Sequence, residues 1–371
     1  MNLKSIIVSV SNDLSHDQRV AKVCSSLHGE GYNVLLVGRK LSNSQPIERD
    51  YKTHRIKLLF NKGFLFYAEF NLRLFFYLLF KTTHVYHSND LDTLLANWLS
   101  AKLRRKKIVY DTHEYFTGVP EIQHNPFIKW SWQTIEKLIF PRLKHVFTVN
   151  HSIANLYNED YGVKPIVMRN LPLNQKIIKL KNRKDLDLPD DKVVVILQGA
   201  GINVDRGSEE LIEAVALSNN FFLCIVGGGD VIEALKKRCL HSDLNGKVRF
   251  IGKLPYEQMM QYTLNSNIGV SLDKDTNINH KFSLPNKIFD YMKAGIPTLA
   301  TNLIEVSNVI SKFDIGYVIN DLKPKTIIGG LEHLMECQKD KNYKNNFNEA
   351  SAELSWEKES KELLEVYRKI W

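Results

Sequence analysis

Hydrophobic residues in the first part of the chain form short continuous runs, which alternate with segments long enough for a helix. The runs at 5–10, 33–38, 54–59, 84–87, 107–111, 145–149 and 165–169 predict strands, and residues 17–27 predict the first helix. A continuous apolar run is typical of a parallel strand that is covered on both faces. The alternation therefore predicts a doubly wound parallel sheet.

A second set of runs, at 193–197, 221–226, 247–251, 268–272 and 298–300, predicts another Rossmann-like sheet. Residues 171–191 are rich in Lys, Asp and Asn and contain two prolines, so we expect a linker there. The C-terminus predicts an amphipathic helix, and the sequence leaves open which domain receives it. The predicted architecture is α/β, with domains at 1–170 and 192–352, a linker at 171–191 and a helix at 353–371 at the domain junction.

One stretch of the second domain, residues 282–300, predicts a helix that binds an anion. Ser283 is a candidate N-cap, Pro285 suits the first turn, and a Gly-x-Pro sequence after residue 294 ends the helix. The helix N-terminus presents unpaired N–H groups, and Lys287 adds a full positive charge. Asp290, one turn later, offers two oxygens to the hydroxyls of a ribose. This pattern indicates a nucleoside diphosphate site, and the alternative is an ordinary capped helix with a solvated Asp290.

Two glycine-containing loops follow predicted strands of the second domain. In the loop at 198–211 the glycines allow the backbone to approach a phosphate, and Arg206 can bind a phosphate with two parallel hydrogen bonds. The alternative is a flexible loop with a solvated arginine. The glycines at 227–229 match an NAD-binding fingerprint poorly, because its third glycine would fall on Ile232.

The first domain offers a histidine at the end of a predicted strand. His113 can donate a hydrogen bond to a sugar hydroxyl or assist proton transfer, with Asp111 and Glu114 fixing its orientation. A purely structural histidine is the alternative. Two facing domains of this class leave a cleft at the carboxyl ends of their strands, which is where ligands bind in open α/β sheets.

Charge is distributed unevenly along the 371 residues. Residues 1–170 carry 23 Lys and Arg against 14 Asp and Glu, whereas the remainder carries 27 of each, so the whole net charge of +9 lies in the first part. A basic face suits an anionic membrane surface, a phosphorylated acceptor or nucleic acid. Nucleic acid ranks last, and we expect none as a partner, because no nucleic-acid-binding motif is present.

The aromatic segment at 64–81 bears on the membrane question. Glu69 and Arg73 interrupt it, so it is not a transmembrane helix. Two interpretations stay open, namely packing against the sheet and an interfacial helix on a membrane. The four cysteines lie far apart, which argues against a disulfide framework or a zinc site, and the N-terminus lacks a signal-peptide pattern. We expect a cytoplasmic protein, with peripheral attachment to the inner face of the cell membrane as a further expectation.

The ordered set of motifs resembles the retaining glycosyltransferases of the GT-B fold known as family 4, or glycosyl transferases group 1. The resemblance runs nearly from end to end and rests on Asp17 and Arg19 before residues 31–34, the pair 113–114, residues 169–172, the pair 206–207, residues 227–229, 250–252, 285–287 and 290–297, and the pair 356–357. It implies two Rossmann-like domains with an interdomain cleft.

The resemblance also implies a role for each candidate residue. A nucleoside diphosphate sugar, with a UDP-sugar favoured, would bind the second domain and a saccharide acceptor the first. Fixed positive groups would stabilise the charge that grows on the diphosphate, so no metal or cofactor is expected. The implied roles are diphosphate binding by Arg206 beside Gly207, phosphate or sugar binding by Ser283, Leu284, Asn286 and Lys287, ribose binding by Asp290, flanking of the base by Gly252 and Leu254, catalytic contact of His113 with the sugar, and an N-terminal loop with Asp17 and Arg19.

Two positions depart from the family pattern. Phe282 stands where the first of two glutamates is usual, eight positions before Asp290, and Ala200 stands where a second basic residue often lies. We predict a glycosyltransferase that moves a sugar to a saccharide acceptor, specifically a lipid-linked intermediate of surface polysaccharide synthesis. The alternatives are a non-catalytic nucleotide-sugar-binding subunit that assists a partner transferase and, on the same sheets, an NAD-dependent dehydrogenase.

Overall fold

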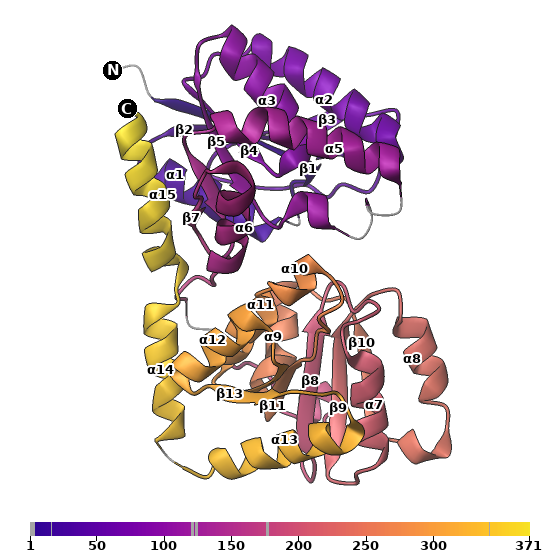
Figure 1. Ribbon diagram of the computed structural model, residues 1–371. Coiled ribbons are helices and arrows are strands. Elements are labelled where there is room, and N and C mark those ends of the chain that lie inside the picture. The colour runs from indigo at the N-terminus through magenta and orange to yellow at the C-terminus, as the bar shows by residue number, and fades with distance from the viewer. Residues whose placement is uncertain (1–3, 16, 120–121, 123–124, 176–177, 341) are drawn as a thin grey trace. The chain divides into compact units, whose positions relative to one another are not determined.

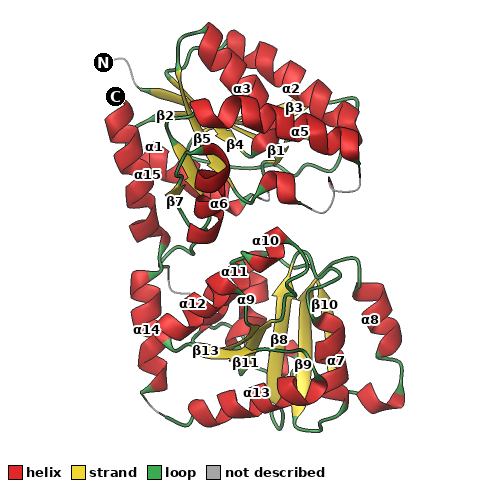
Figure 2. Ribbon diagram, in the orientation of Figure 1, coloured by secondary structure: helices red, strands yellow, loops and turns green. Residues whose placement is uncertain are grey.

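The computed structural model describes residues 4–15, 17–119, 122, 125–175, 178–340 and 342–371. The chain divides into two compact units (Figure 1). The first unit comprises Met1–Asn170 and Trp356–Trp371, and the second comprises Leu171–Ser355. Each unit is a parallel sheet covered by helices (Figure 2).

The described part of the first unit contains seven parallel strands in the order β3-β2-β1-β4-β5-β6-β7. Every strand predicted from the apolar runs is present, which confirms the doubly wound sheet. The strands are β1 (Ser5–Asp13), β2 (Asn33–Lys40), β3 (Lys52–Lys57), β4 (Val85–Asn89), β5 (Lys107–Thr112), β6 (Val146–Thr148) and β7 (Ile166–Val167). The helices are α1 (Gln18–Gly29), α2 (Gly63–Leu79), α3 (Leu91–Leu103), α5 (Pro126–Ile139), α6 (His151–Tyr161) and α15 (Trp356–Ile370).

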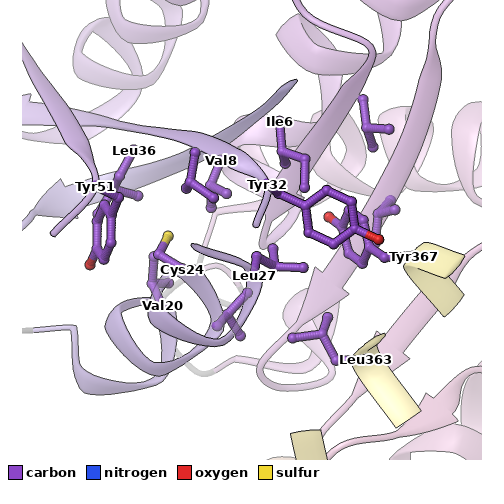
Figure 3. Packing of buried hydrophobic residues seen from close by; sticks show 14 of the residues in the cluster. Ile6, Val8, Val20, Cys24, Leu27, Tyr32, Leu36, Tyr51, Leu363 and Tyr367 are labelled. Carbon is purple, nitrogen blue, oxygen red and sulfur yellow. The ribbon is translucent and has the colours of Figure 1, made fainter. Parts of the chain in front are cut away.

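One face of the first sheet is covered by α1 and α15. Apolar residues recur on the inward side of both helices and pack on β1 and β2, as Figure 3 shows for Ile6, Val8, Val20, Cys24, Leu27, Leu36, Leu363 and Tyr367. The Tyr367 hydroxyl also lies 2.7 Å from His87 Nδ1 in β4. These contacts answer the question that the sequence left open, because they assign the C-terminal helix to the first unit.

The opposite face of this sheet is covered by α2 and α3. Phe66, Phe70, Leu74 and Leu78 of α2 recur every four residues and are buried in one cluster with strands β2 and β4. Fully burying each such side chain contributes roughly 1.5–3 kcal/mol. Of the two interpretations of the aromatic segment, packing against the sheet is therefore correct for this side of α2. Within the described residues, no helix is both long and apolar enough to cross a membrane.

The described part of the second unit contains six parallel strands in the order β10-β9-β8-β11-β12-β13. The strands are β8 (Val193–Gly199), β9 (Phe221–Gly227), β10 (Val248–Gly252), β11 (Ile268–Ser271), β12 (Thr298–Thr301) and β13 (Gly316–Ile319). The helices are α7 (Ser208–Ala216), α8 (Ile232–Arg238), α9 (Tyr256–Leu264), α10 (Ile278–Lys281), α11 (Asn286–Ala294), α12 (Ile304–Phe313), α13 (Pro324–Cys337) and α14 (Tyr343–Glu353). Among the strands of the described residues, only β13, a short edge strand, lacks a counterpart in the prediction.

The segment 171–191, expected to be a linker, is part of the second unit. Leu171, Leu186 and Leu188 are buried in its apolar clusters. Arg183 fastens the segment further, because its guanidinium donates hydrogen bonds to the Asn265 carbonyl and to Asn267 Oδ1. Three leucines spread among charged residues give no periodic pattern, which is why the composition indicated a linker.

Candidate active site

The helix predicted to bind an anion begins at Asn286, and Pro285 occupies its N-cap position. The prediction that Ser283 caps this helix is wrong, because no side chain makes a hydrogen bond at the cap. Ser283 lies three residues before the first helical residue, too early in the chain to cap it. Its hydroxyl is buried and has no hydrogen-bond partner in the described part of the chain. Asn286 is exposed in the first turn, and Leu284 is partly buried against an apolar cluster.

A buried aspartate brings the two predicted phosphate-binding cations together. Asp273 follows β11 and is fully buried. Arg206 Nη1 lies 3.1 Å from Asp273 Oδ1, and Lys287 Nζ lies 3.9 Å from Asp273 Oδ2. The Thr301 hydroxyl fixes the Asp273 backbone by donating to its carbonyl at 2.6 Å. Two cations share one carboxylate, so this group keeps an excess of positive charge at the N-terminus of α11.

Burial and charge act in opposite directions on these groups. Burial alone would raise the pKa of Asp273, but Lys287 and Arg206 outweigh it and hold the pKa below its ordinary value. Burial lowers the pKa of Lys287, and the Asp273 carboxylate opposes this effect. Removing the carboxylate would therefore leave a desolvated ammonium group without its main partner.

Asp290, the predicted ribose ligand, is oriented by two donors. Gln198 Nε2 donates to Asp290 Oδ2, and the Tyr256 hydroxyl donates to Asp290 Oδ1, both at 2.9 Å. Gln198 is itself held by the Thr263 hydroxyl, which donates to Gln198 Oε1 at 2.7 Å. Burial, followed by the charge of Asp290, raises the pKa of Tyr256, so the phenol stays protonated and remains a donor. The carboxylate is thus fixed in place at the edge of the second sheet.

The segment predicted to flank a base runs past the same helix. Gly252 ends β10 with a φ of 78°, and Leu254 is partly buried beside the cluster that contains Tyr291 of α11. Tyr256, two residues after Leu254, is the residue that contacts Asp290. The β10–α9 connection therefore lies next to the ribose candidate.

Glycine is required where the loops of the second sheet meet. A Cβ on Gly207 would lie 2.3 Å from the Leu272 carbonyl oxygen, and the φ of Gly207 is +70°. A Cβ on Gly227 would lie 1.8 Å from the Gly199 carbonyl oxygen, and one on Gly229 would lie 1.9 Å from that of Ile202. The glycines at 227–229 thus let the β9 loop pack on the β8 loop, an explanation that needs no dinucleotide.

In the first unit, His113 lies between two carboxylates. Its Nδ1 is 3.1 Å from Asp90 Oδ2, and its Nε2 is 3.6 Å from Asp111 Oδ2. The His113 backbone N–H also donates to Asp90 Oδ1 at 2.8 Å. Asp111 is buried and accepts two hydrogen bonds from Arg19, at 3.0 and 2.6 Å. Of the two carboxylates predicted to orient His113, Asp111 lies near the ring but beyond hydrogen-bond distance, and Glu114 is exposed. Asp90 was not predicted.

Asp17 and Arg19, the predicted N-terminal loop residues, make different contacts at the start of α1. Asp17 is the N-cap of α1 and accepts a hydrogen bond from the Val20 N–H at 3.0 Å. Arg19 is buried, and besides Asp111 it donates to the Met168 carbonyl at 2.6 Å. Arg19 therefore acts on His113 through Asp111.

The electrostatics of this group favour a charged imidazole. Burial lowers the pKa of His113, but Asp90 and then Asp111 outweigh that effect and raise it well above the ordinary value. Asp90 has a φ of 54°, a left-handed conformation that costs a non-glycine residue of order 1–3 kcal/mol. Asp92, in the first turn of α3, accepts a hydrogen bond from the Ser11 hydroxyl, and burial followed by the charge of Asp90 raises its pKa to about 7. No three His, Cys, Asp or Glu side chains of the described ranges are grouped so as to hold a metal ion.

Two family models match this chain. The model described as "Glycosyl transferases group 1" matches residues 178–354, and the model described as "Glycosyltransferase Family 4" matches residues 18–170. The chain belongs to the family 4-type glycosyltransferases. No curated protein matches the sequence.

Solved structures resemble this glycosyltransferase over its whole length. Sucrose-phosphate synthase from Thermosynechococcus elongatus has a TM-score of 0.81 at 17% identity and covers 99% of both chains. A glycosyltransferase from Rickettsia africae has a TM-score of 0.77 at 14% identity, over 100% of this chain and 99% of that one. HepE from Anabaena, in complex with UDP-glucose, has a TM-score of 0.71 at 13% identity, over 98% and 99%. These likenesses confirm the GT-B fold predicted from the sequence.

Proposed function

We propose that this glycosyltransferase takes its sugar from a nucleoside diphosphate sugar, which binds at the carboxyl edge of the second sheet. The observation that carries the proposal is the group of Arg206, Asp273 and Lys287 beside the N-terminus of α11. Its excess positive charge and the helix dipole both favour a diphosphate. Asp290, already fixed by two donors, would bind the ribose hydroxyls.

Charge on the leaving group governs the proposed reaction. Breaking the bond between the sugar and the diphosphate leaves negative charge on the diphosphate, and cations fixed in place beforehand stabilise that charge as it develops. His113, held as an imidazolium by Asp90 and Asp111, would hydrogen-bond the transferred sugar. The acceptor hydroxyl then attacks on the face that the diphosphate leaves, which retains the anomeric configuration. The proposal includes metal independence, so a chelator should leave the rate unchanged.

A uridine donor is the preferred choice, because HepE, of similar fold, was crystallised with UDP-glucose. The first test is a melting screen of the full chain against uridine, guanosine, adenosine and cytidine diphosphate sugars. A ligand at about a hundred times its dissociation constant adds roughly 2.7 kcal/mol to stability. We expect a uridine diphosphate sugar to raise the melting temperature of the wild type and to lose this effect in Arg206→Ala. No shift with any of the four nucleotides would overturn the proposal.

For the acceptor we propose a saccharide that is lipid-linked or anionic, as in surface polysaccharide synthesis at a membrane. Support comes from the net charge of residues 1–170, which holds the whole excess of +9. The test compares transfer to lipid-linked and free saccharides with the same donor. Faster transfer to neutral free saccharides would contradict this part of the proposal.

A non-catalytic nucleotide-sugar-binding subunit is the second candidate. The candidate is favoured by Phe282, which stands in place of the usual glutamate. In the structure, the Lys281 ammonium lies 5.7 Å from the centre of the Phe282 ring. An active transferase should slowly hydrolyse its donor and lose that activity in His113→Ala while still binding the donor. A binding subunit would show donor-induced stabilisation in both proteins and turnover in neither.

A further inference from the structure

A groove in the first unit lies between edge strand β3 and the C-terminal half of α2. Its volume is about 670 Å³, and a second cavity of about 400 Å³ continues it toward the amino ends of β1 and β2. Neither cavity is lined by Asp90, Asp111 or His113, so the groove is separate from the candidate active site. The larger cavity is lined by His54, Arg55, Ile56, Lys57, Arg73, Phe76, Tyr77, Phe80 and Lys81.

The groove is basic. Among the described residues, no Asp or Glu lines either cavity. Arg55 and Arg73 each bind a carboxylate of their own unit. Lys57 and Lys81 are exposed, and the Lys81 ammonium lies 5.2 Å from the centre of the Tyr77 ring. The two lysines give the groove a positive charge that suits an anionic ligand.

Apolar side chains recur along the outer side of α2, next to the ion pair of Glu69 and Arg73. This α2 stripe consists of side chains that are 51–84% exposed: Phe64, Leu65, Leu72, Phe76 and Phe80 at the helix end. Helix α5 extends it, since the ring of Phe127 is 6.2 Å from that of Phe64 and 6.2 Å from that of Trp130. Because the opposite side of α2 is buried in the sheet core, the stripe is additional apolar surface and not a core face.

We propose that the α2 stripe and the groove together bind an anionic phospholipid bilayer, with a lipid phosphate headgroup in the groove between Lys57 and Lys81. An interfacial helix buries its apolar side at the boundary between headgroups and acyl chains, and nearby Lys and Arg add attraction to anionic lipid. Phe76 and Phe80 line the groove and also belong to the stripe. A lipid can therefore place its headgroup in the groove while its acyl chains contact the stripe. A free phosphate would leave the stripe exposed, and a second copy of the chain would bring two basic grooves together. This proposal deepens the membrane part of the proposed function.

The first test measures sedimentation of the full chain with vesicles at low salt. Wild type should sediment with vesicles of phosphatidylglycerol and phosphatidylcholine but not with phosphatidylcholine alone. The double variant Lys57→Glu and Lys81→Glu should bind about tenfold or more weakly. Its control, Lys325→Glu with Lys344→Glu, makes the same change of charge at exposed positions of the second unit and should bind as wild type does.

The second test addresses the stripe. Phe76→Ser with Phe80→Ser should also weaken vesicle binding. Leu217→Ser with Leu240→Ser removes side chains that are 67% and 85% exposed in the second unit and should not. Folding of each variant is checked by far-ultraviolet circular dichroism and by its urea midpoint.

Three outcomes would overturn the proposal. The first is equal binding by the groove variant and its charge-matched control, and the second is equal binding to neutral and anionic vesicles. The third is displacement of the protein from vesicles by millimolar inorganic phosphate, which would make the groove a phosphate site. Donor binding is measured separately, by melting temperature. Failure of the membrane proposal therefore leaves the proposed donor site untouched, and failure of the donor site leaves the membrane proposal untouched.

Discussion

Carboxylates hold the charged side chains in both groups of candidate residues. Asp273 joins Arg206 to Lys287 in the second unit, and Asp90 holds His113 in the first. Each carboxylate stabilises the charged form of the side chains next to it and also fixes their positions. Catalysis by charge stabilisation requires such fixed positions, because groups that must reorient during the reaction lose much of their effect.

Replacing Asp273 by Asn should lower the free energy of unfolding by about 2–3 kcal/mol, because it leaves two cations without their shared carboxylate. The matched control is Asp275→Asn, two residues later and exposed, which should change stability by less than about 0.5 kcal/mol. Urea unfolding at neutral pH measures both. Equal stability of the two variants would show that Asp273 does not hold the cations.

The charge of His113 predicts a pH dependence. Its folded pKa is raised above the unfolded value, so its contribution to stability is fully present below about pH 6.5 and is lost as the pH rises through the folded pKa. The difference in free energy of unfolding between wild type and His113→Gln should therefore shrink as the pH is raised from 6 to 9. His241→Gln, at an exposed position, serves as the control and should show no such trend. A difference that grows with pH would contradict the assignment.

At the scale of elements, Glu136 joins α5 to its neighbours. The carboxylate accepts hydrogen bonds from the Thr117 hydroxyl at 3.1 Å and from the Tyr161 hydroxyl of α6 at 2.8 Å. Burial raises the pKa of Glu136 to about 6 in spite of these donors. A buried carboxyl that favours its neutral form makes the packing of α5 dependent on pH.

Glu136→Gln should remove that dependence. Because the folded pKa lies above the unfolded value, the folded state binds the proton more tightly, and wild-type stability falls as the pH rises from about 4.5 to 6. Relative to the variant, wild type should lose about 2 kcal/mol between pH 4 and pH 7. Urea midpoints across this range measure the effect, with the exposed Glu159→Gln as control. Parallel curves for wild type and Glu136→Gln would refute it.

The loop before α7 gives another prediction at this scale. Gly207 and Gly246 have nearly the same φ, 70° and 69°, but only at Gly207 would a Cβ meet another atom, the Leu272 carbonyl oxygen at 2.3 Å. Both alanine variants suffer backbone strain, and Gly207→Ala should cost about 1–3 kcal/mol more because of the overlap. Thermal unfolding of the two variants side by side checks this difference, and equal losses would mean that the β11 end moves freely.

At the scale of the whole molecule, the alternation of apolar runs was enough to predict two parallel sheets and nearly every strand. Periodicity identifies buried strands, but it does not identify which distant segments meet. The placement of the C-terminal helix on the first unit, and of Leu186 and Leu188 in the second, depends on packing between segments far apart in sequence.

The same limit applies to the candidate site. Arg206, Lys287 and Asp290 were predicted because a helix terminus and a glycine loop are local patterns. Asp273 was not, because its role depends on Arg206, which lies 67 positions away. A polar residue directly after an apolar strand was the available signal.

In the proposed reaction, Arg206 and its partners stabilise the charge on a departing diphosphate. The most direct measurement is the rate of nucleoside diphosphate release from the preferred donor by the full chain, for wild type and Arg206→Ala. Loss of one such group should slow release by about a hundredfold or more, whereas Arg238→Ala, on α8, should leave the rate unchanged. Equal rates for wild type and Arg206→Ala, at saturating donor, would show that Arg206 does not stabilise the departing diphosphate.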